Sequence, residues 1–138
     1  MKINTLAGLV LATLTLPLTS LAAPRDDILA FYASAAKAAS PAFSGFSAPR
    51  GEQLYVTKFA GGKPDTPACT SCHADSPRSA GRTPTGKSIE AVAVSVTPTR
   101  YTDAAKVEKW FKRNCNEVLG RACTPLEKGD WLSYMISL

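Results

Sequence analysis

The sequence predicts a small all-α domain whose long loops wrap around one bulky ligand. Apolar residues recur at helical spacing along the chain, and the apolar–polar alternation that indicates strands is absent. The stretch from Ala74 to Tyr101 is mostly loop and contains several prolines and glycines. So long an irregular segment is unusual in a small domain unless it surrounds a ligand that completes the core.

Composition is ordinary for one globular domain. The 138 residues include 45% hydrophobic and 20% charged residues, which excludes a disordered chain and a membrane transporter. The formal net charge of +5 favours acidic partners weakly and does not indicate binding to nucleic acid. With one His and four Cys, few kinds of metal or cofactor site are available.

The N-terminus has the pattern of a secretory signal peptide. Lys2 precedes an apolar stretch from Leu6 to Leu18, and small residues follow before Ala23. The apolar stretch is shorter than the ~20 residues that a membrane-spanning helix needs. We therefore expect residues 1–22 to be removed, with a cut after residue 23 as the alternative. The mature protein is then expected in the periplasm, where disulfides persist.

Residues 23–49 are predicted to form an N-terminal helix and a linker, and residues 50–138 the remaining domain. The first helix is expected over about 25–37. One face of it carries Ile28, Phe31, Tyr32 and Ala35. A second helix is expected over about 50–59, and the run from Gly61 to Pro67 then has turn chemistry that lets backbone pass close to a bulky group.

Two better-marked helices are predicted in the C-terminal third. The first is expected from Asp103 to Leu119, with Thr102 as its N-cap and Gly120 at its end. The second opens with Thr124-Pro125-Leu126-Glu127, which predicts a capping box around a proline at the first helical position. This last helix is expected to continue to the C-terminus.

The run Cys69-Thr70-Ser71-Cys72-His73 matches the Cys-x-x-Cys-His signature of haem c attachment. In one helical turn, two thiols reach two vinyl groups on one porphyrin edge, and the imidazole reaches the iron. We therefore predict one covalent haem c, bound by Cys69, Cys72 and His73, with His73 as the proximal iron ligand.

Three alternatives compete with haem attachment. A structural zinc site would use Cys69, Cys72 and two of His73, Cys115 and Cys123. The latter two cysteines are farther apart than the paired ligands of most zinc sites. A thioredoxin-like motif needs a strand-helix-strand context that the sequence does not predict. The third alternative is a plain disulfide within the motif.

The sixth iron ligand is constrained by the side chains present. Because His73 is the only histidine, two histidines of one chain cannot hold the iron, and the alternatives are Met, Lys, Asn, Tyr or no protein ligand. Met135 is the only methionine beyond the leader, and it shares a helix face with Trp131, Tyr134 and Leu138, which indicates core packing.

Asn114 is the polar residue within an apolar helix stripe. At about 100° per residue it falls beside Phe111 and Val118, whereas Asn116 falls on the opposite, lysine-rich side. A buried amide without a partner costs about 1–3 kcal/mol, so Asn114 needs one. Its partner is either a backbone group or the haem iron as distal ligand.

Cys115 and Cys123 are expected to form a disulfide. Haem attachment uses the other two cysteines, and thiols are not kept reduced outside the cytoplasm. This bond is expected to restrain the movement of the helix that carries Asn114.

The sequence resembles the sphaeroides haem protein family of class I-like c-type cytochromes. The resemblance covers residues 51–138 and rests on Gly61–Pro67 before the haem motif, Gly81–Lys87, Arg113-Asn114-Cys115-Asn116 and Gly120–Lys128. It implies one haem, Asn114 as a sixth ligand that leaves on reduction, and O2, NO or CO as small ligands. It also implies a dihaem cytochrome c or a membrane cytochrome b as redox partner.

The class I fold adds further expectations. Gly51 and Tyr55 are expected to cross Trp131 or Tyr134 of the last helix. Arg82 and Lys87 are expected either to pair with haem propionates or to be solvated. A basic set is suited to steer an acidic partner, with a solvated helix face as the alternative. It consists of Lys106, Lys109, Lys112, Arg113 and Arg121.

The predicted function is therefore an electron carrier that binds a diatomic gas when ferrous. Enzymatic oxidase or NO-processing activity is left open, and the alternative is an electron-transfer cytochrome with a permanent sixth ligand.

Overall fold

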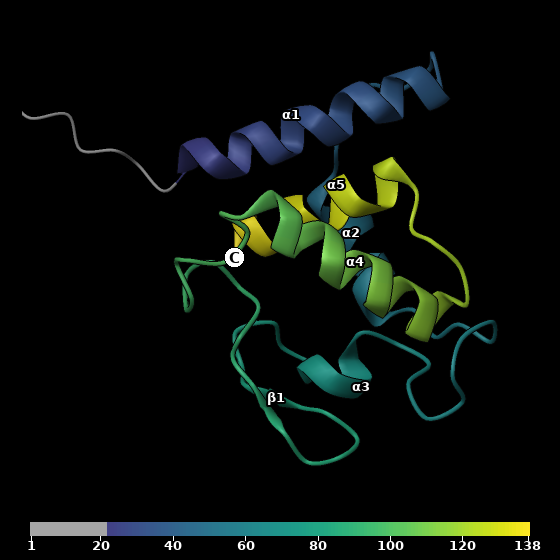
Figure 1. Cartoon of the computed structure of the whole chain (residues 1–138), viewed down its shortest axis with the longest axis vertical. Coiled ribbons are helices and arrows are strands. Elements are labelled where there is room, and N and C mark those ends of the chain that lie inside the picture. The colour runs from purple at the N-terminus through teal and green to yellow at the C-terminus, as the bar shows by residue number, and fades with distance from the viewer. Residues whose placement is uncertain (1–21) are drawn as a thin grey trace, which may run out of the picture.

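The computed structural model describes residues 22–138, so the predicted leader lies, apart from its last residue, outside the described part. The helices are α1 (Ala22–Ala39), α2 (Ala48–Val56), α3 (Thr70–His73), α4 (Ala104–Leu119) and α5 (Pro125–Ser137). Two short strands, β1 (Gly81–Arg82) and β2 (Ser88–Ile89), pair in antiparallel fashion. In Figure 1, α1 lies along one side of α4 and α5, and α3 lies on the opposite side with the long loop. The all-α prediction is confirmed.

α2 crosses α5 at close range because Gly51 has no side chain. A Cβ atom built on Gly51 would lie 2.1 Å from the carbonyl oxygen of Asp130. Beyond this contact, the rings of Tyr55 and Tyr134 meet edge to face, with centroids 6.0 Å apart. The predicted crossing of Gly51 and Tyr55 with the last helix is thus confirmed, with Tyr134 as the partner. Arg50 adds an ion pair to Asp130 at 2.7 Å.

α1 packs against α5 through Ile28 and Tyr32, which join a core cluster with Val107 and Leu132. The predicted apolar face is wrong at Phe31, which is 65% exposed. The buried stripe instead includes Arg25, whose guanidinium donates to the carbonyls of Arg100 and Pro98. The buried face of α1 is therefore not the face on which the sequence places the apolar residues, because one of its buried positions is taken by the hydrogen-bonded Arg25.

Local capping explains the bounds of the two long C-terminal helices. The carboxylate of Asp103 accepts from the Lys106 N–H and caps α4, so the prediction of Thr102 as N-cap is wrong. The Thr102 hydroxyl donates instead to the carbonyl of Thr99. Gly120 ends α4 in the left-handed conformation, with φ of 72°. The capping box of α5 forms as predicted between Thr124 and Glu127.

Ser47 caps α2, which therefore begins two residues before the predicted helix and ends three residues before its predicted end. The segment 74–101 is irregular except for the hairpin of β1 and β2, whose two-residue strands are too short to show an alternating pattern. This hairpin was not predicted. Within residues 22–138, no helix is both long and apolar enough to cross a membrane.

Candidate functional site

The Cys-x-x-Cys-His motif folds into a single helical turn. The backbone N–H groups of Cys72 and His73 both donate to the carbonyl of Cys69, at 3.2 and 3.0 Å. Residues three positions apart in such a turn share one side of it, so both thiols lie on the same side. Neither thiol is bonded to another sulfur. The turn thus presents two thiols and an imidazole together, as attachment of haem c requires.

The protonation states of these side chains fit haem c. Burial and the positive charge of Arg100 lower the pKa of His73 to about 4, so its imidazole is neutral at pH 7. Its buried Nδ1 has no hydrogen-bond partner among residues 22–138. A neutral imidazole is the form that ligates iron. Burial raises the pKa of Cys69 to about 11 and also raises that of Cys72, so both are thiols at pH 7.

Backbone contacts hold the motif in place from two sides. The hydroxyl of the fully buried Tyr55 on α2 lies 2.9 Å from the carbonyl of His73 and 2.7 Å from that of Ala74. A Cβ atom built on Gly81 of β1 would lie 2.0 Å from the Cys72 carbonyl oxygen. The hairpin therefore rests directly on the motif, and only glycine fits at this contact.

The motif also lies close to the C-terminal half of α4. The charges of Glu117 and Arg113 on α4 both act on the pKa of Cys72, with opposite signs. Just before the motif, the Lys63 N–H donates to the carbonyl of Glu117 at 2.7 Å. The segment that leads into the motif therefore packs on the C-terminal half of α4, where a Cβ atom built on Gly62 would also meet the carbonyl oxygens of Glu117 and Val118.

Asn114 and Asn116 lie in different environments on α4. Asn114 is half-buried, and its side chain makes no hydrogen bond within the described part of the chain. Asn116 is exposed, and its amide donates to the carbonyl of Lys112 at 2.5 Å. The helical period therefore separates the two amides as expected from the sequence. Trp110, four residues before Asn114 on the same helix, is 44% exposed.

Met135 is fully buried on α5 and belongs to a core cluster with Tyr55 and Val92. This is the core packing that the sequence predicted for Met135. Its backbone carbonyl also accepts from the Val94 N–H at 3.0 Å, which ties the long loop to α5.

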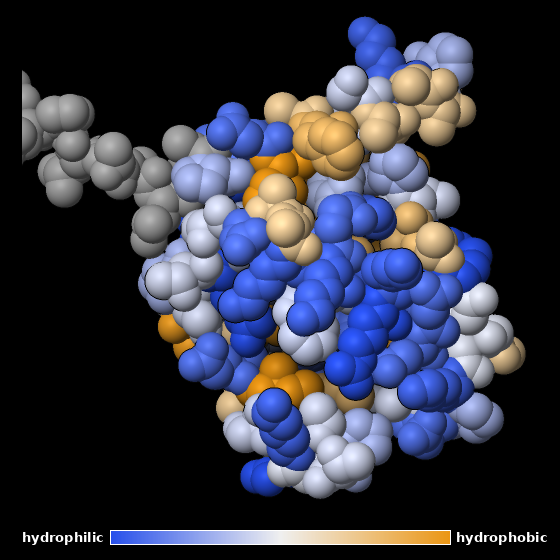
Figure 2. Space-filling view, viewed as in Figure 1, coloured by the Kyte–Doolittle hydropathy of each residue, from blue (hydrophilic) through white to orange (hydrophobic). Residues whose placement is uncertain are grey.

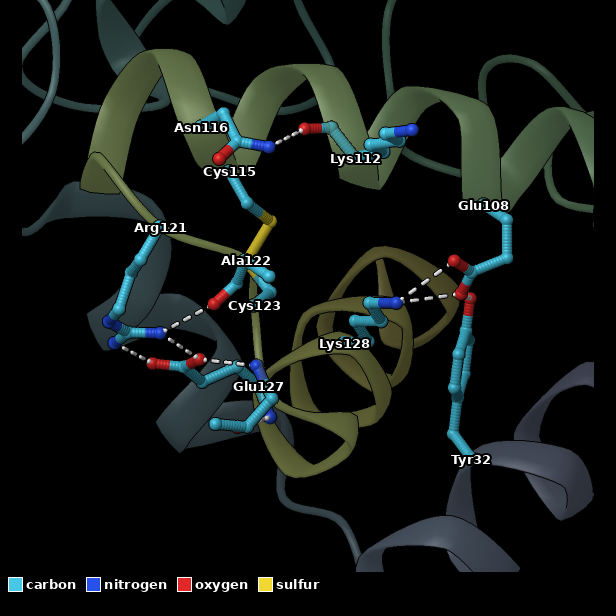
Figure 3. Close-up of a disulfide and its surroundings, with 11 residues drawn as sticks. Tyr32, Glu108, Lys112, Cys115, Asn116, Arg121, Ala122, Cys123, Glu127 and Lys128 are labelled. Atoms are coloured by element: carbon cyan, nitrogen blue, oxygen red, sulfur yellow. Dashed lines mark hydrogen bonds and ion pairs between the residues drawn. A yellow bond between two sulfur atoms is a disulfide. The ribbon is translucent and has the colours of Figure 1, made fainter.

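The structure contains the expected disulfide between Cys115 on α4 and Cys123 before α5 (Figure 3). Both residues are buried with Val118 and Leu119. The bond leaves only Cys69, Cys72 and His73 from the proposed set of zinc ligands. Within the described range, no group of three or more His, Cys, Asp or Glu residues is placed to hold a metal ion.

Removing the disulfide is expected to lower the stability of the holoprotein. By the chain-entropy estimate, a bond closing so short a loop contributes about 2–3 kcal/mol. Replacing both cysteines by serine should shift the midpoint of guanidinium unfolding downward, measured on the ferric protein by far-UV circular dichroism. Equal midpoints for the variant and the parent protein would contradict this contribution.

Exposed basic side chains cover the outer face of α4. Lys106, Lys109 and Lys112 are exposed, and none has an ion-pair partner among the residues described. Arg113 pairs within the helix with Glu117, and Arg121 pairs with Glu127 at 2.6 Å. Figure 2 shows hydrophilic side chains gathered over this helix. Arg82 donates to the Gly86 carbonyl within the hairpin.

Sequence reasoning missed a polar contact among three helices, which Figure 3 draws beside the disulfide. Tyr32 of α1 and Lys128 of α5 both hydrogen-bond to Glu108 of α4. Tyr32 and Glu108 are 76 residues apart, so no local pattern links them. A tyrosine on the apolar face of a predicted helix was the only signal available.

Three comparisons with known proteins agree with one another. A family model described as a domain of unknown function, DUF1924, matches residues 41–135. The cytochrome c-type protein SHP of Cereibacter sphaeroides is 54% identical over 88 residues, which are 64% of this chain and 68% of SHP. Cytochrome c'' of Methylophilus methylotrophus is 35% identical over 107 residues, covering 77% of this chain and 74% of that protein.

Solved structures show the same similarity. The structure of oxidised SHP, described as an oxygen-binding cytochrome c, matches with a TM-score of 0.76 at 46% identity, covering 83% of this chain and 96% of SHP. The crystal structure of oxidised cytochrome c'' matches with a TM-score of 0.73 at 32% identity, covering 83% and 94% of the two chains.

Proposed function

This chain belongs to the sphaeroides haem protein family of c-type cytochromes, which carry covalently bound haem c. From this premise we propose that it is a monohaem electron carrier. We also propose that it binds a diatomic gas when its iron is ferrous. When bound, haem c supplies an iron that changes between ferric and ferrous and accepts two axial ligands. The residues of this chain decide which ligands those are.

Cys69 and Cys72 attach the cofactor, and His73 ligates its iron. The single helical turn, the two unbonded thiols and the neutral imidazole support these roles. Tyr55 and Gly81 fix the backbone of the turn and thereby orient His73.

Asn114 provides the second axial ligand in the ferric state. The observation that carries this assignment is the half-buried Asn114 amide, without a hydrogen bond in residues 22–138, on the part of α4 whose charges act on Cys72. Beyond the leader, neither a methionine nor a second histidine is left to take this position, and Lys106, Lys109 and Lys112 of α4 are exposed. Met135 is in the core, and His73 is the only histidine.

The ligand chemistry of an amide oxygen makes the site sensitive to redox state. A neutral, hard oxygen donor favours ferric over ferrous iron, so reduction weakens its bond. Asn114 would then release more easily, and the position that it leaves would be open to a small ligand such as O2, NO or CO. The SHP structure is described as that of an oxygen-binding cytochrome c, which supports binding of a diatomic gas by this chain.

Electrons are supplied by a protein partner with an acidic surface, such as a dihaem cytochrome c or a membrane cytochrome b. The exposed lysines of α4 support docking by charge attraction. The disulfide supports export, and we place the mature protein in the periplasm, after removal of residues 1–22.

Carbon monoxide tests the open ferrous site. Absorption spectra of the reduced holoprotein are recorded before and after addition of CO. We expect a shift of the Soret band on CO addition, because no protein ligand blocks the sixth position. Low-spin bands in both redox states, unchanged by CO, would instead identify an electron carrier with a permanent sixth ligand.

A further inference from the structure

Three helices meet at the carboxylate of Glu108. The hydroxyl of Tyr32 on α1 donates to Oε1 of Glu108 on α4 at 2.5 Å. The ammonium of Lys128 on α5 donates to both oxygens of the same carboxylate, at 2.7 and 3.0 Å. Figure 3 shows the carboxylate between the other two side chains. One side chain of α4 is therefore bound to both neighbouring helices.

Aromatic rings complete this contact and extend it toward Asn114. The Lys128 Nζ lies 5.3 Å from the ring centroid of Tyr32 and 5.8 Å from that of Phe111. Phe111 also meets the rings of Tyr32 and Trp131 edge to face. Phe111 lies three residues before Asn114, so the two share a side of α4. The packing of Phe111 thus links the contact to the ligand-bearing side of the helix.

Asn114 lies between two attachments of α4 to the rest of the fold. Glu108 attaches the helix before Asn114, and the disulfide of Cys115 attaches it immediately afterwards. A helix held on both sides of a ligand cannot easily move away as a rigid body. Release of Asn114 is then expected to occur by side-chain rotation or small local shifts. The two attachments determine how the Asn114 amide is oriented toward the iron.

We propose that Tyr32, Glu108 and Lys128 are positioning residues that hold α4 so that Asn114 binds ferric iron firmly. This proposal rests on the proposed role of Asn114 as iron ligand. The proposal also assigns a role to α1, which lies outside the residues 41–135 that the family model matches. In this account α1 is part of the ligand-binding apparatus as well as of the core.

The test measures how strongly Asn114 competes with an added ligand. Imidazole binding to the ferric holoprotein requires displacement of Asn114, so a loosened helix should increase imidazole affinity. We expect the imidazole affinity to rise roughly tenfold in Tyr32→Phe, because the buried hydroxyl loses its hydrogen bond to a charged group. The Glu108 side chain is 46% exposed, so the rise in Glu108→Gln should be smaller, at roughly threefold. The reduction potential of the haem should rise in the same variants, by about 59 mV for each tenfold decrease in the binding constant of Asn114 for ferric iron.

The matched control is Lys109→Gln. It changes the charge of the same helix by one unit, but Lys109 is exposed and has no ion-pair partner among residues 22–138. Imidazole affinity should stay within about twofold of the parent value in this control. Tyr32→Phe keeps the ring and removes only the hydroxyl, so the core is preserved, and thermal unfolding recorded in parallel reports structural loss separately.

A double-mutant cycle separates failure of this proposal from failure of the ligand assignment. Asn114→Ala should raise imidazole affinity by itself, and Tyr32→Phe should add nothing in that background. If Asn114→Ala raises the affinity but neither Tyr32→Phe nor Glu108→Gln does, the positioning role is overturned and the ligand role stands. If Asn114→Ala leaves the affinity unchanged, the ligand assignment fails, and the positioning role fails with it.

Discussion

The double variant Cys69→Ser/Cys72→Ser is expected to lose essentially all covalently bound haem. Haem c is held by two thioether bonds, and a serine hydroxyl does not replace a thiol in forming them. Denaturing electrophoresis followed by haem staining measures the covalent fraction directly, on protein exported from a host that attaches haem c. We expect no stained band for this variant and a strong band for the parent protein.

The chain offers a control of the same chemistry. Cys115→Ser/Cys123→Ser removes the same number of sulfur atoms, but these two cysteines form the disulfide between α4 and α5. This control should stain for haem like the parent protein. Covalent haem in Cys69→Ser/Cys72→Ser, or its loss in the control alone, would contradict the assignment of the attachment site.

Loss of haem should also affect the fold, because the long loop depends on the cofactor. Residues 74–101 contain only two strands of two residues each. Covalent haem stays attached to the unfolded chain, so it stabilises the fold through the apolar contacts that it makes only in the folded state. The haem-free variant should therefore unfold at lower temperature than the parent protein.

The parts of the fold that were predictable from sequence are those specified by neighbouring residues. Thr124 and Glu127 begin α5 through hydrogen bonds that span three positions, so the pattern is visible locally. The haem motif is visible for the same reason. At the start of α4, Thr102 and Asp103 are both good N-caps, and the sequence alone does not choose between them. The structure selects Asp103.

The parts that were missed depend on contacts between distant segments. Phe31 is as apolar as Tyr32, yet only Tyr32 is buried, because its hydroxyl meets Glu108 and its ring meets Phe111. Burial of Arg25 depends on carbonyl acceptors more than 70 residues away. The proposed site residue Asn114 could be singled out because its helix has an apolar stripe, whereas the residues proposed to position this helix carry no such signal.

The ferric spectrum of Asn114→Ala tests the central claim most directly. Removal of the amide should leave the ferric iron five-coordinate or bound to water, which converts the low-spin absorption spectrum of the parent protein to a high-spin one. CO binding to the reduced variant should persist, because we propose that reduction of the parent protein already releases Asn114. Asn116→Ala removes an exposed amide two residues away and should leave the ferric spectrum unchanged. An Asn114→Ala spectrum identical to that of the parent protein would show that Asn114 is not the ligand.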